Sequence, residues 1–260
     1  MIIYKTTEEI EAIREGGAIL SRILTELVAM AKPGVMTGDL DAYAEQQMRA
    51  AGGEPSFKGY RTSPRVRPFP STVCISLNHE VVHAPATPSR VVADGDLLKL
   101  DIGLRYKGLC TDMAVTVAVG KVSEQSLELI RATKQSMLLG IEKAQPGAWI
   151  SDIGKTVDKH VRRFGFSTVK DLVGHGVGKH VHEDPRIPNY FDPELDPVRI
   201  KKGMVLAIEP MVNIGTDEVR YLADEWTIVT ADKKLSAHFE VTIAITDKGM
   251  EIMTPVPVNV

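Results

Sequence analysis

Apolar residues recur at helical spacing in four stretches of the chain. Thr6 and Glu9 form a capping-box pattern, and the apolar positions after it predict a helix to about Ala31, where Pro33 and Gly34 end it. A second helix is predicted from near Thr37 to about residue 51, where two glycines follow. The same spacing predicts helices over residues 123–144 and 151–164.

Short β-branched runs separated by turn residues predict strands between these helices. They fill residues 73–119, and further strands are predicted near residues 169–173, 204–212, 225–230 and 238–246. A helix pair followed by strands therefore occurs twice along the chain.

The letters of the sequence repeat in the same order. The segment 31–40 resembles 144–153, the segment 95–101 resembles 203–209, and Asp112 with its apolar tail resembles Glu240 with its own. We therefore expect an α+β fold with two pseudo-symmetric halves, roughly 1–120 and 121–260, in one domain over 1–260. A mostly antiparallel sheet covered by helices is the architecture that this order favours.

Five residues interrupt or end strongly apolar runs, where an unpaired charge would be very costly. They are Asp101, Asp112, His175, Glu209 and Glu240. Four carboxylates and one imidazole in such places are stable together if they share a cation. The pattern therefore indicates a metal site.

Strand pairing brings the first two carboxylates together. If Tyr106 and Lys107 form a two-residue hairpin loop, Asp101 opposes Asp112 on one face, with Cβ atoms about 5 Å apart. A bulge at Gly108 would instead shift the register by one residue. By the internal repeat, Glu209 and Glu240 should form the matching pair.

Charge balance favours two ions over one. Four carboxylates supply about four negative charges, which two divalent cations balance, and paired ions are a common arrangement for hydrolysis. Oxygen donors with one imidazole suit Co(II), Mn(II), Fe(II) or Zn(II) and argue against a thiolate zinc site. The sequence leaves the identity of the metal open.

Composition excludes several classes of protein. The 260 residues are 43% hydrophobic and 25% charged with a net charge of −3, which gives no case for DNA or a membrane surface as the main partner. Two cysteines, an N-terminus without signal-peptide features and the lack of any run long enough to span a membrane predict a cytoplasmic protein.

Several motifs resemble those of the type I methionine aminopeptidases, which share the pita-bread fold with prolidase, aminopeptidase P and creatinase. The matching text includes residues 73–78 leading to His83, the segment 96–103, Gly174 to Gly178 with His182, the segment 208–213, and Phe239 with Glu240. The resemblance covers almost the whole chain and includes the five candidate ligands in order.

The resemblance implies removal of the N-terminal methionine from nascent proteins when the second residue is small and uncharged. It also implies that one ion is held by Asp112, His175, Glu209 and Glu240, and the other by Asp101, Asp112 and Glu240. Glu209 would handle the proton of the attacking water, His182 would stabilise the oxyanion and His83 would contact the scissile amide or the intermediate. The methionine pocket implied by the family pattern consists of Tyr60, Phe69, Cys74 and Trp226.

The chain departs from the family pattern at three places. Ala84 and Val181 stand where glycine and an aromatic residue are common, and the basic stretch 61–68 is longer than the usual connection before Phe69. That stretch predicts a solvated loop, with transient contact to the ribosome or to acidic chains as the alternative. The remaining histidines, His79, His160, His180 and His238, are interpreted as structural or surface residues.

Two other functions compete with this interpretation. One is a proline-specific aminopeptidase or dipeptidase of the same fold, and the other is a non-catalytic paralogue that binds nucleic acid or protein. Retention of all five ligands argues against the second. We expect a monomer whose partners are the N-termini of nascent polypeptides.

Overall fold

The computed structural model describes residues 1–195, 197–258 and 260. The helices are α1 (Thr7–Met30), α2 (Thr37–Ala50), α3 (Glu124–Ile141) and α4 (Ile150–Val161), and a 3-10 turn, η1 (Arg162–Phe164), follows α4. The strands are β1 (Glu54–Pro55), β2 (Val73–Leu77), β3 (Glu80–Val82), β4 (Leu97–Tyr106), β5 (Leu109–Ala118), β6 (Ser167–Thr168), β7 (Gly174–Gly176), β8 (Glu183–Ile187), β9 (Val205–Ile208), β10 (Met211–Asn213), β11 (Val219–Tyr221), β12 (Ile228–Thr230), β13 (Ser236–His238), β14 (Glu240–Thr246) and β15 (Gly249–Ile252).

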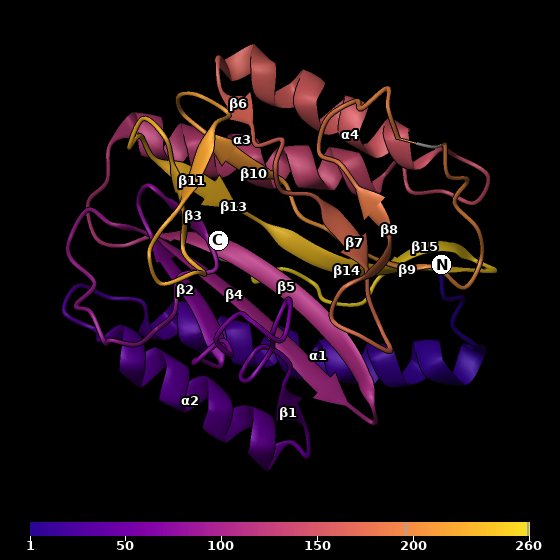
Figure 1. Ribbon diagram of the computed structural model, residues 1–260, viewed down its shortest axis with the longest axis horizontal. Helices are drawn as coiled ribbons and strands as arrows, with labels where there is room; N and C mark the ends of the chain where they lie inside the picture. The colour runs from indigo at the N-terminus through magenta and orange to yellow at the C-terminus, as the bar shows by residue number, and fades with distance from the viewer. Residues whose placement is uncertain (196, 259) are drawn as a thin grey trace.

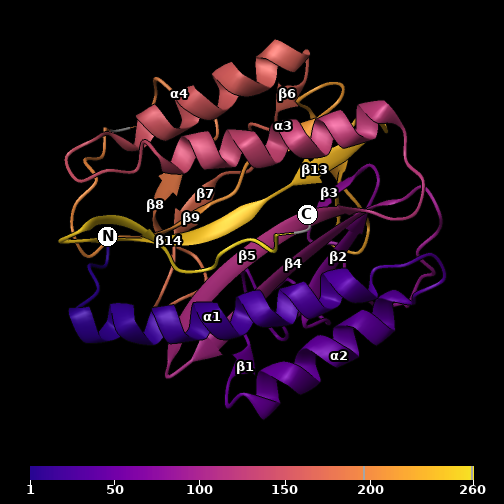
Figure 2. The same cartoon turned by 180° about the vertical axis from the view of Figure 1, so that it is seen from behind.

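One large sheet organises the molecule. Its strand order is β1-β4-β5-β14-β9-β7-β8, with β2 also paired to β4 and β15 to β14. Helices α1 and α2 cover the back of one half, and α3 and α4 cover the back of the other (Figures 1 and 2). The curved, mostly antiparallel sheet with helices on one side confirms the predicted pita-bread architecture.

The centre of the sheet reflects the internal repeat. Strands β4, β5, β14 and β9 lie side by side in antiparallel pairs, so the hairpin of the first half meets its counterpart from the second. Because β5 and β14 are the inner neighbours, Asp112 and Glu240 lie nearest the join between the halves. Asp101 and Glu209 belong to the flanking strands.

Helix α1 shows how local sequence fixes an element of this frame. The Thr6 hydroxyl accepts a hydrogen bond from the backbone N–H of Glu9, and the Glu9 carboxylate accepts one from the backbone N–H of Thr6. This confirms the predicted capping box. The apolar face of the helix, with Leu20 and Leu24 fully buried, packs against the core beneath β4 and β5.

The predicted register of the β4–β5 hairpin is wrong by two residues. Lys107 and Gly108 form the loop, both with positive φ (49° and 79°), so Asp101 opposes Ala114 and Asp112 opposes Gly103. Positive φ at both loop residues is the conformation of a type I′ turn, which matches the twist of the strands. Because side chains alternate with period two, a shift of two keeps both aspartates on the same face as diagonal neighbours.

Three predicted strands differ in the structure: one is absent, one is interrupted and one is shorter. The prediction over 169–173 is wrong, because β6 and β7 lie on either side and Leu172 faces a cavity instead of pairing. Pro210 lacks the N–H that would continue β9, so the strand predicted over 204–212 breaks into β9 and β10. The strand predicted over 225–230 begins only at Ile228, because the Asp224 carboxylate accepts hydrogen bonds from the N–H groups of Trp226 and Thr227.

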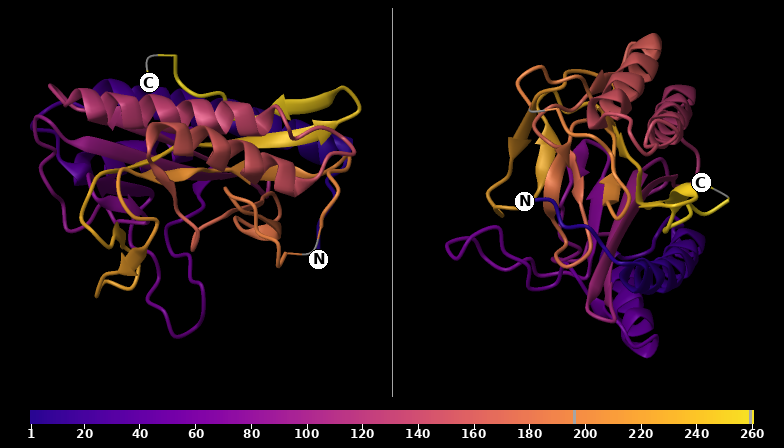
Figure 3. Two further views of the ribbon diagram at one scale, coloured as in Figure 1. Left: turned by 90° about the horizontal axis from the view of Figure 1, so that it is seen from above. Right: turned by 90° about the vertical axis from the view of Figure 1, so that its right-hand side faces the viewer.

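The front of the molecule carries loops. The purple segment 58–69 and the golden segment around β11 project on the side opposite the helices (Figure 3). Among the residues that the structure describes, no helix combines the length and the apolar character needed to cross a membrane.

Candidate metal centre and substrate pocket

The five candidate ligands come from neighbouring strands of the large sheet. Asp101 lies in β4, Asp112 in β5 and Glu240 at the start of β14, opposite Ala114 of β5. His175 lies in β7 opposite Ala207 of β9, and Glu209 directly follows β9. The predicted residues therefore meet because these strands are adjacent.

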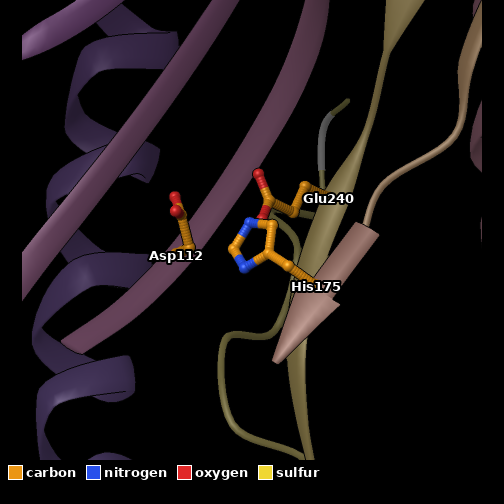
Figure 4. Close-up of side chains that lie close together, drawn as sticks. All are labelled: Asp112, His175 and Glu240. Carbon is orange, nitrogen blue, oxygen red and sulfur yellow. The ribbon is translucent and has the colours of Figure 1, made fainter. Parts of the chain in front are cut away.

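Their side chains point toward one another. Ligand atoms of Asp112, His175 and Glu240 all lie within 4.8 Å of each other, in a cluster visible in Figure 4. His175 Nε2 lies 3.2 Å from Glu209 Oε1. A second cluster with the same limit joins Glu209 and Glu240 to His238.

The orientation of the His175 ring is fixed by the backbone of the next residue. Its Nδ1 lies 2.9 Å from the carbonyl oxygen of Gly176 and can donate a hydrogen bond to it. That contact leaves Nε2 as the nitrogen that faces the carboxylates. Metal-binding histidines commonly use one nitrogen in this way while the other binds the ion.

Burial and mutual repulsion disfavour ionisation of three carboxylates. Burial raises the pKa of Asp101 to about 7, and burial together with neighbouring acidic groups raises the pKa values of Asp112 and Glu240 well above the usual range. Asp101 Oδ1, Asp112 Oδ1 and Glu240 Oε1 have no hydrogen-bond partner within the part of the chain that the structure describes. Buried polar atoms of this kind are normally paired.

Glu209 is the exception among the four. Burial opposes its ionisation, but the imidazoles of His175 and His238 outweigh that effect and lower its pKa to about 2. Burial lowers the pKa of His175, but the hydrogen bond to Glu209 and the charge of that carboxylate outweigh this effect. The pKa of the imidazole is therefore raised.

The donor set fits divalent metal ions. Cation coordination would satisfy the buried oxygens without partners, relieve the repulsion between the carboxylates and use the imidazole nitrogen that faces them. The thiol of Cys74 lies beside them, but burial and the nearby Asp101 hold its pKa well above the usual range, so it stays protonated. The donors are therefore oxygen and imidazole nitrogen, without thiolate.

Asp101 stands slightly apart from the clusters. It belongs to neither group of closely spaced ligand atoms, although it shares a face with Asp112. Its neighbour across the β2–β4 pair is Cys74.

A cavity of about 370 Å³ lies over this centre. All eleven residues predicted for the site line it, and they are Tyr60, Phe69, Cys74, His83, Asp101, Asp112, His175, His182, Glu209, Trp226 and Glu240. The structure thus brings the whole predicted set together. It also adds Phe57, Thr62, Leu172, Tyr221, Glu225 and Ile228 to the walls.

The two predicted catalytic histidines occupy different positions on the cavity wall. His83 has a left-handed backbone (φ 60°), and burial lowers its pKa to about 4. His182 lies at the exposed rim, where its Nδ1 is 2.8 Å from the Tyr60 hydroxyl and its ring packs edge-on against His175. Partial burial and the neighbouring His175 lower its pKa as well. Both rings are therefore neutral at pH 7.

One end of the cavity is apolar. The rings of Phe69 and Trp226 meet edge to face at 5.2 Å, and both pack in one buried cluster with Cys74 and Val181. Val181 is therefore buried behind the pocket and does not line it. Ala84 is buried too, beside the β2 strand that carries Cys74.

The basic stretch forms part of the cavity rim. Arg61, Arg65 and Arg67 are exposed, and Arg67 Nε lies 3.8 Å from a carboxylate oxygen of Glu225 on the opposite segment. The solvated loop predicted from the sequence is therefore present, and it borders the opening.

The sequence interpretation missed His238. It treated the residue as structural, yet Nε2 lies 3.7 Å from Glu209 Oε2 and 4.0 Å from Glu240 Oε2. One signal was available, because residues two apart in extended chain face the same side and His238 precedes Glu240 by two.

A sheet that gathers four carboxylates and a histidine under a partly apolar pocket defines the class of metal-dependent hydrolases. Comparison with known proteins agrees. Residues 11–247 match Metallopeptidase family M24, and the chain belongs to this family.

Relatives match over nearly the full length. The chain is 44% identical to a methionine aminopeptidase of Clostridium acetobutylicum, covering 98% of this chain and 99% of that protein. It is 45% identical to methionine aminopeptidase 1 of Bacillus subtilis, covering 98% and 100%. A crystal structure of methionine aminopeptidase from Thermotoga maritima superposes with a TM-score of 0.92 at 38% identity, covering 98% and 99%.

Prolidases share the fold at lower similarity. The prolidase of Pyrococcus furiosus superposes with a TM-score of 0.76 at 24% identity, and this chain covers 66% of its length. That likeness concerns the fold alone. The family expected from the sequence is therefore confirmed, and the higher identities lie with the methionine aminopeptidases.

Proposed function

We propose that this chain removes the N-terminal methionine from proteins and peptides when the second residue is small and uncharged. The observation that carries the proposal is the apolar end of the cavity, which adjoins the carboxylate cluster in a chain 44–45% identical to bacterial methionine aminopeptidases. An unbranched methionine side chain suits a pocket walled by Phe69, Cys74 and Trp226, and sulfur packs favourably against aromatic rings.

Two divalent ions are our proposal for the metal content. Asp112, His175, Glu209 and Glu240 would hold one, and Asp101, Asp112 and Glu240 the other. When bound, the ions would lower the pKa of water and polarise the scissile carbonyl. Cobalt, manganese, iron and zinc all suit such donors.

Glu209 is the proposed proton acceptor for the attacking water. The two imidazoles beside it keep it ionised, and Asn189 Nδ2 donates a 3.0 Å hydrogen bond to its backbone carbonyl. A general base must be both deprotonated and held within reach of the proton it takes.

His83 and His182 are proposed to act as neutral hydrogen-bond donors. His182 would stabilise the developing oxyanion from the rim, and His83 would contact the scissile amide from the wall. Because both pKa values are lowered, neither ring adds a positive charge that would repel a divalent ion.

The proposal also covers the oligomeric state of the protein and its cellular compartment. We expect a monomer in which both halves form a single catalytic domain over 1–260, acting on nascent chains with transient contact to the ribosome. Both cysteines are buried as free thiols, which supports the reducing cytoplasm as its compartment.

A pair of peptides tests the proposal against proline-specific cleavage. The metal-loaded protein should release methionine from Met-Ala-Ser and leave Xaa-Pro peptides intact, with free methionine and Xaa quantified by chromatography. Faster cleavage of the Xaa-Pro peptides would favour the prolidase-like activity, and no cleavage of either would favour a non-catalytic paralogue.

A further inference from the structure

His238 is a buried histidine whose ring has no conventional partner. Its side chain is 2% exposed, and neither Nδ1 nor Nε2 has a hydrogen bond to any residue that the structure describes. Leaving a buried polar group unsatisfied costs about 1 to 3 kcal/mol. A ring kept in such a place needs an explanation.

The backbone holds the ring where it is. The N–H of His238 donates to the Thr116 hydroxyl at 2.8 Å, and that hydroxyl donates to the His238 carbonyl at 2.8 Å. On its other side His238 pairs with Met211 across β10 and β13. The ring position therefore follows from the sheet.

The ring faces one carboxylate oxygen, Oε2, of each of two candidate ligands. Nε2 lies 3.7 Å from Glu209 Oε2 and 4.0 Å from Glu240 Oε2. His175 faces the other oxygen of Glu209, with Nε2 at 3.2 Å from Oε1. Each oxygen of Glu209 thus faces a different imidazole.

These distances distinguish a residue that binds a metal ion from one that contacts the residues binding it. Two adjacent ligands of one ion, bound at about 2.1 Å and at tetrahedral or right angles, lie about 3.0 to 3.4 Å apart, and two ligands on opposite sides of an octahedral ion lie about 4.2 Å apart. The His175–Glu209 separation falls in the range for adjacent ligands, whereas both separations of His238, 3.7 and 4.0 Å, lie between the two values. His238 is therefore placed to contact the carboxylates and not the ion that they would share.

We propose that His238 is a positioning residue of the metal centre. An N–H at Nε2 would attract Oε2 of Glu209 across 3.7 Å, with Oε2 of Glu240 as its second neighbour at 4.0 Å, and would leave Oε1 of Glu209, which faces His175, available to a metal ion. The inference rests on the proposed role of Glu209 and Glu240 as metal ligands. Removal of a residue that orients metal ligands typically weakens metal affinity by about 10 to 100 times.

Metal binding measured by calorimetry tests the proposal. Metal-stripped protein is titrated with Mn(II) for the native chain, His238→Leu, His238→Asn and His238→Gln. The Leu and Asn variants should bind Mn(II) about 10 to 100 times more weakly. Gln retains a donor N–H at similar reach, so it should keep most of the native affinity.

A second readout counts the coordinating histidines. In the Co(II)-loaded protein, each histidine bound to the ion gives one strongly shifted exchangeable N–H resonance in the proton NMR spectrum. His175 alone should contribute, so the native chain and His238→Gln should each show one. His180→Gln, at an exposed histidine that does not line the cavity, is the matched control and should change neither readout.

Three results would overturn the proposal. They are native Mn(II) affinity in both His238→Leu and His238→Asn, affinity in His238→Gln as weak as in those two variants, or a second shifted resonance that disappears with His238. The Asn variant serves if the Leu variant does not fold. If the native chain itself binds no Mn(II), the proposed metal centre fails, which is a different outcome from native binding that His238 does not affect.

Discussion

At the scale of single residues, the surroundings of Glu209 explain its chemistry. Its position after β9 is set by Pro210, its backbone carbonyl is held by Asn189, and its carboxylate lies between two imidazoles. The two imidazoles lower the pKa of Glu209 to about 2, whereas burial and neighbouring carboxylates raise the pKa values of Asp112 and Glu240. One carboxylate of the four is therefore kept ionised and fixed.

Glu209→Gln should remove catalysis while preserving the fold. The amide has nearly the same shape but cannot accept the proton of the attacking water, and loss of a general base typically costs about 10² to 10⁴ in rate. Methionine release from Met-Ala-Ser should fall by that factor, with an unchanged circular dichroism spectrum. Native turnover in this variant would refute the role assigned to Glu209.

The sequence predicted the five candidate ligands because a charge inside an apolar run is costly and therefore conspicuous. His238 has no such mark, since an isolated histidine near a strand is often structural. Its closeness to Glu209 depends on the pairing of β10 with β13 and on the break at Pro210. The local pattern of apolar and polar residues does not reveal these long-range contacts.

At the scale of elements, close packing of α1 against the C-terminal segment constrains one glycine. A Cβ added at Gly17 would lie 2.1 Å from the carbonyl oxygen of Met253, whereas one at the adjacent Gly16 would lie 3.3 Å from its nearest neighbour, Tyr106 Cβ. A backbone carbonyl cannot move aside as a flexible side chain can.

Gly17→Ala should therefore destabilise the protein despite the better helix propensity of alanine. Overpacking typically costs about 1 to 3 kcal/mol, and the favourable propensity term is only about 1 kcal/mol. Urea denaturation should show a clear loss of unfolding free energy in Gly17→Ala. Gly16→Ala is the matched control and should stay near the native value; equal losses in both would contradict the packing argument.

The elements themselves were largely predictable from periodicity, but the register of the β4–β5 hairpin was not. The loop residues Lys107 and Gly108 both have positive φ, and the twist of long strands selects that turn over the one placed a residue earlier. The segment 169–173 failed for a related reason, because Leu172 serves the cavity wall and not a strand.

At the scale of the whole molecule, the two halves bring acidic side chains close together at the centre of the sheet. Asp101 has a pKa of about 7 in the fold, against about 3.9 when exposed, and Asp112 and Glu240 are shifted in the same direction. The metal-free fold therefore binds these protons more tightly than the unfolded chain. The stability they contribute is present below about pH 4 and is lost as pH rises toward 7.

Metal should reverse this loss, because cations replace the protons between the carboxylates. The difference in melting temperature between Mn(II)-loaded and EDTA-treated protein should therefore widen from pH 5 to pH 8. Glu209, with its pKa lowered to about 2, titrates below this window and does not alter the trend. A difference that stays constant or narrows with pH would contradict the proposed sharing of a cation.

The central claim is a metal-dependent release of N-terminal methionine, and re-addition of metal tests it most directly. Protein stripped with a chelator is titrated with Mn(II) while methionine release from Met-Ala-Ser is followed. We predict no release without metal, and recovery of activity as the carboxylate cluster fills. Full activity in the stripped protein, or none at any occupancy of Mn(II), Fe(II), Co(II) or Zn(II), would contradict the account.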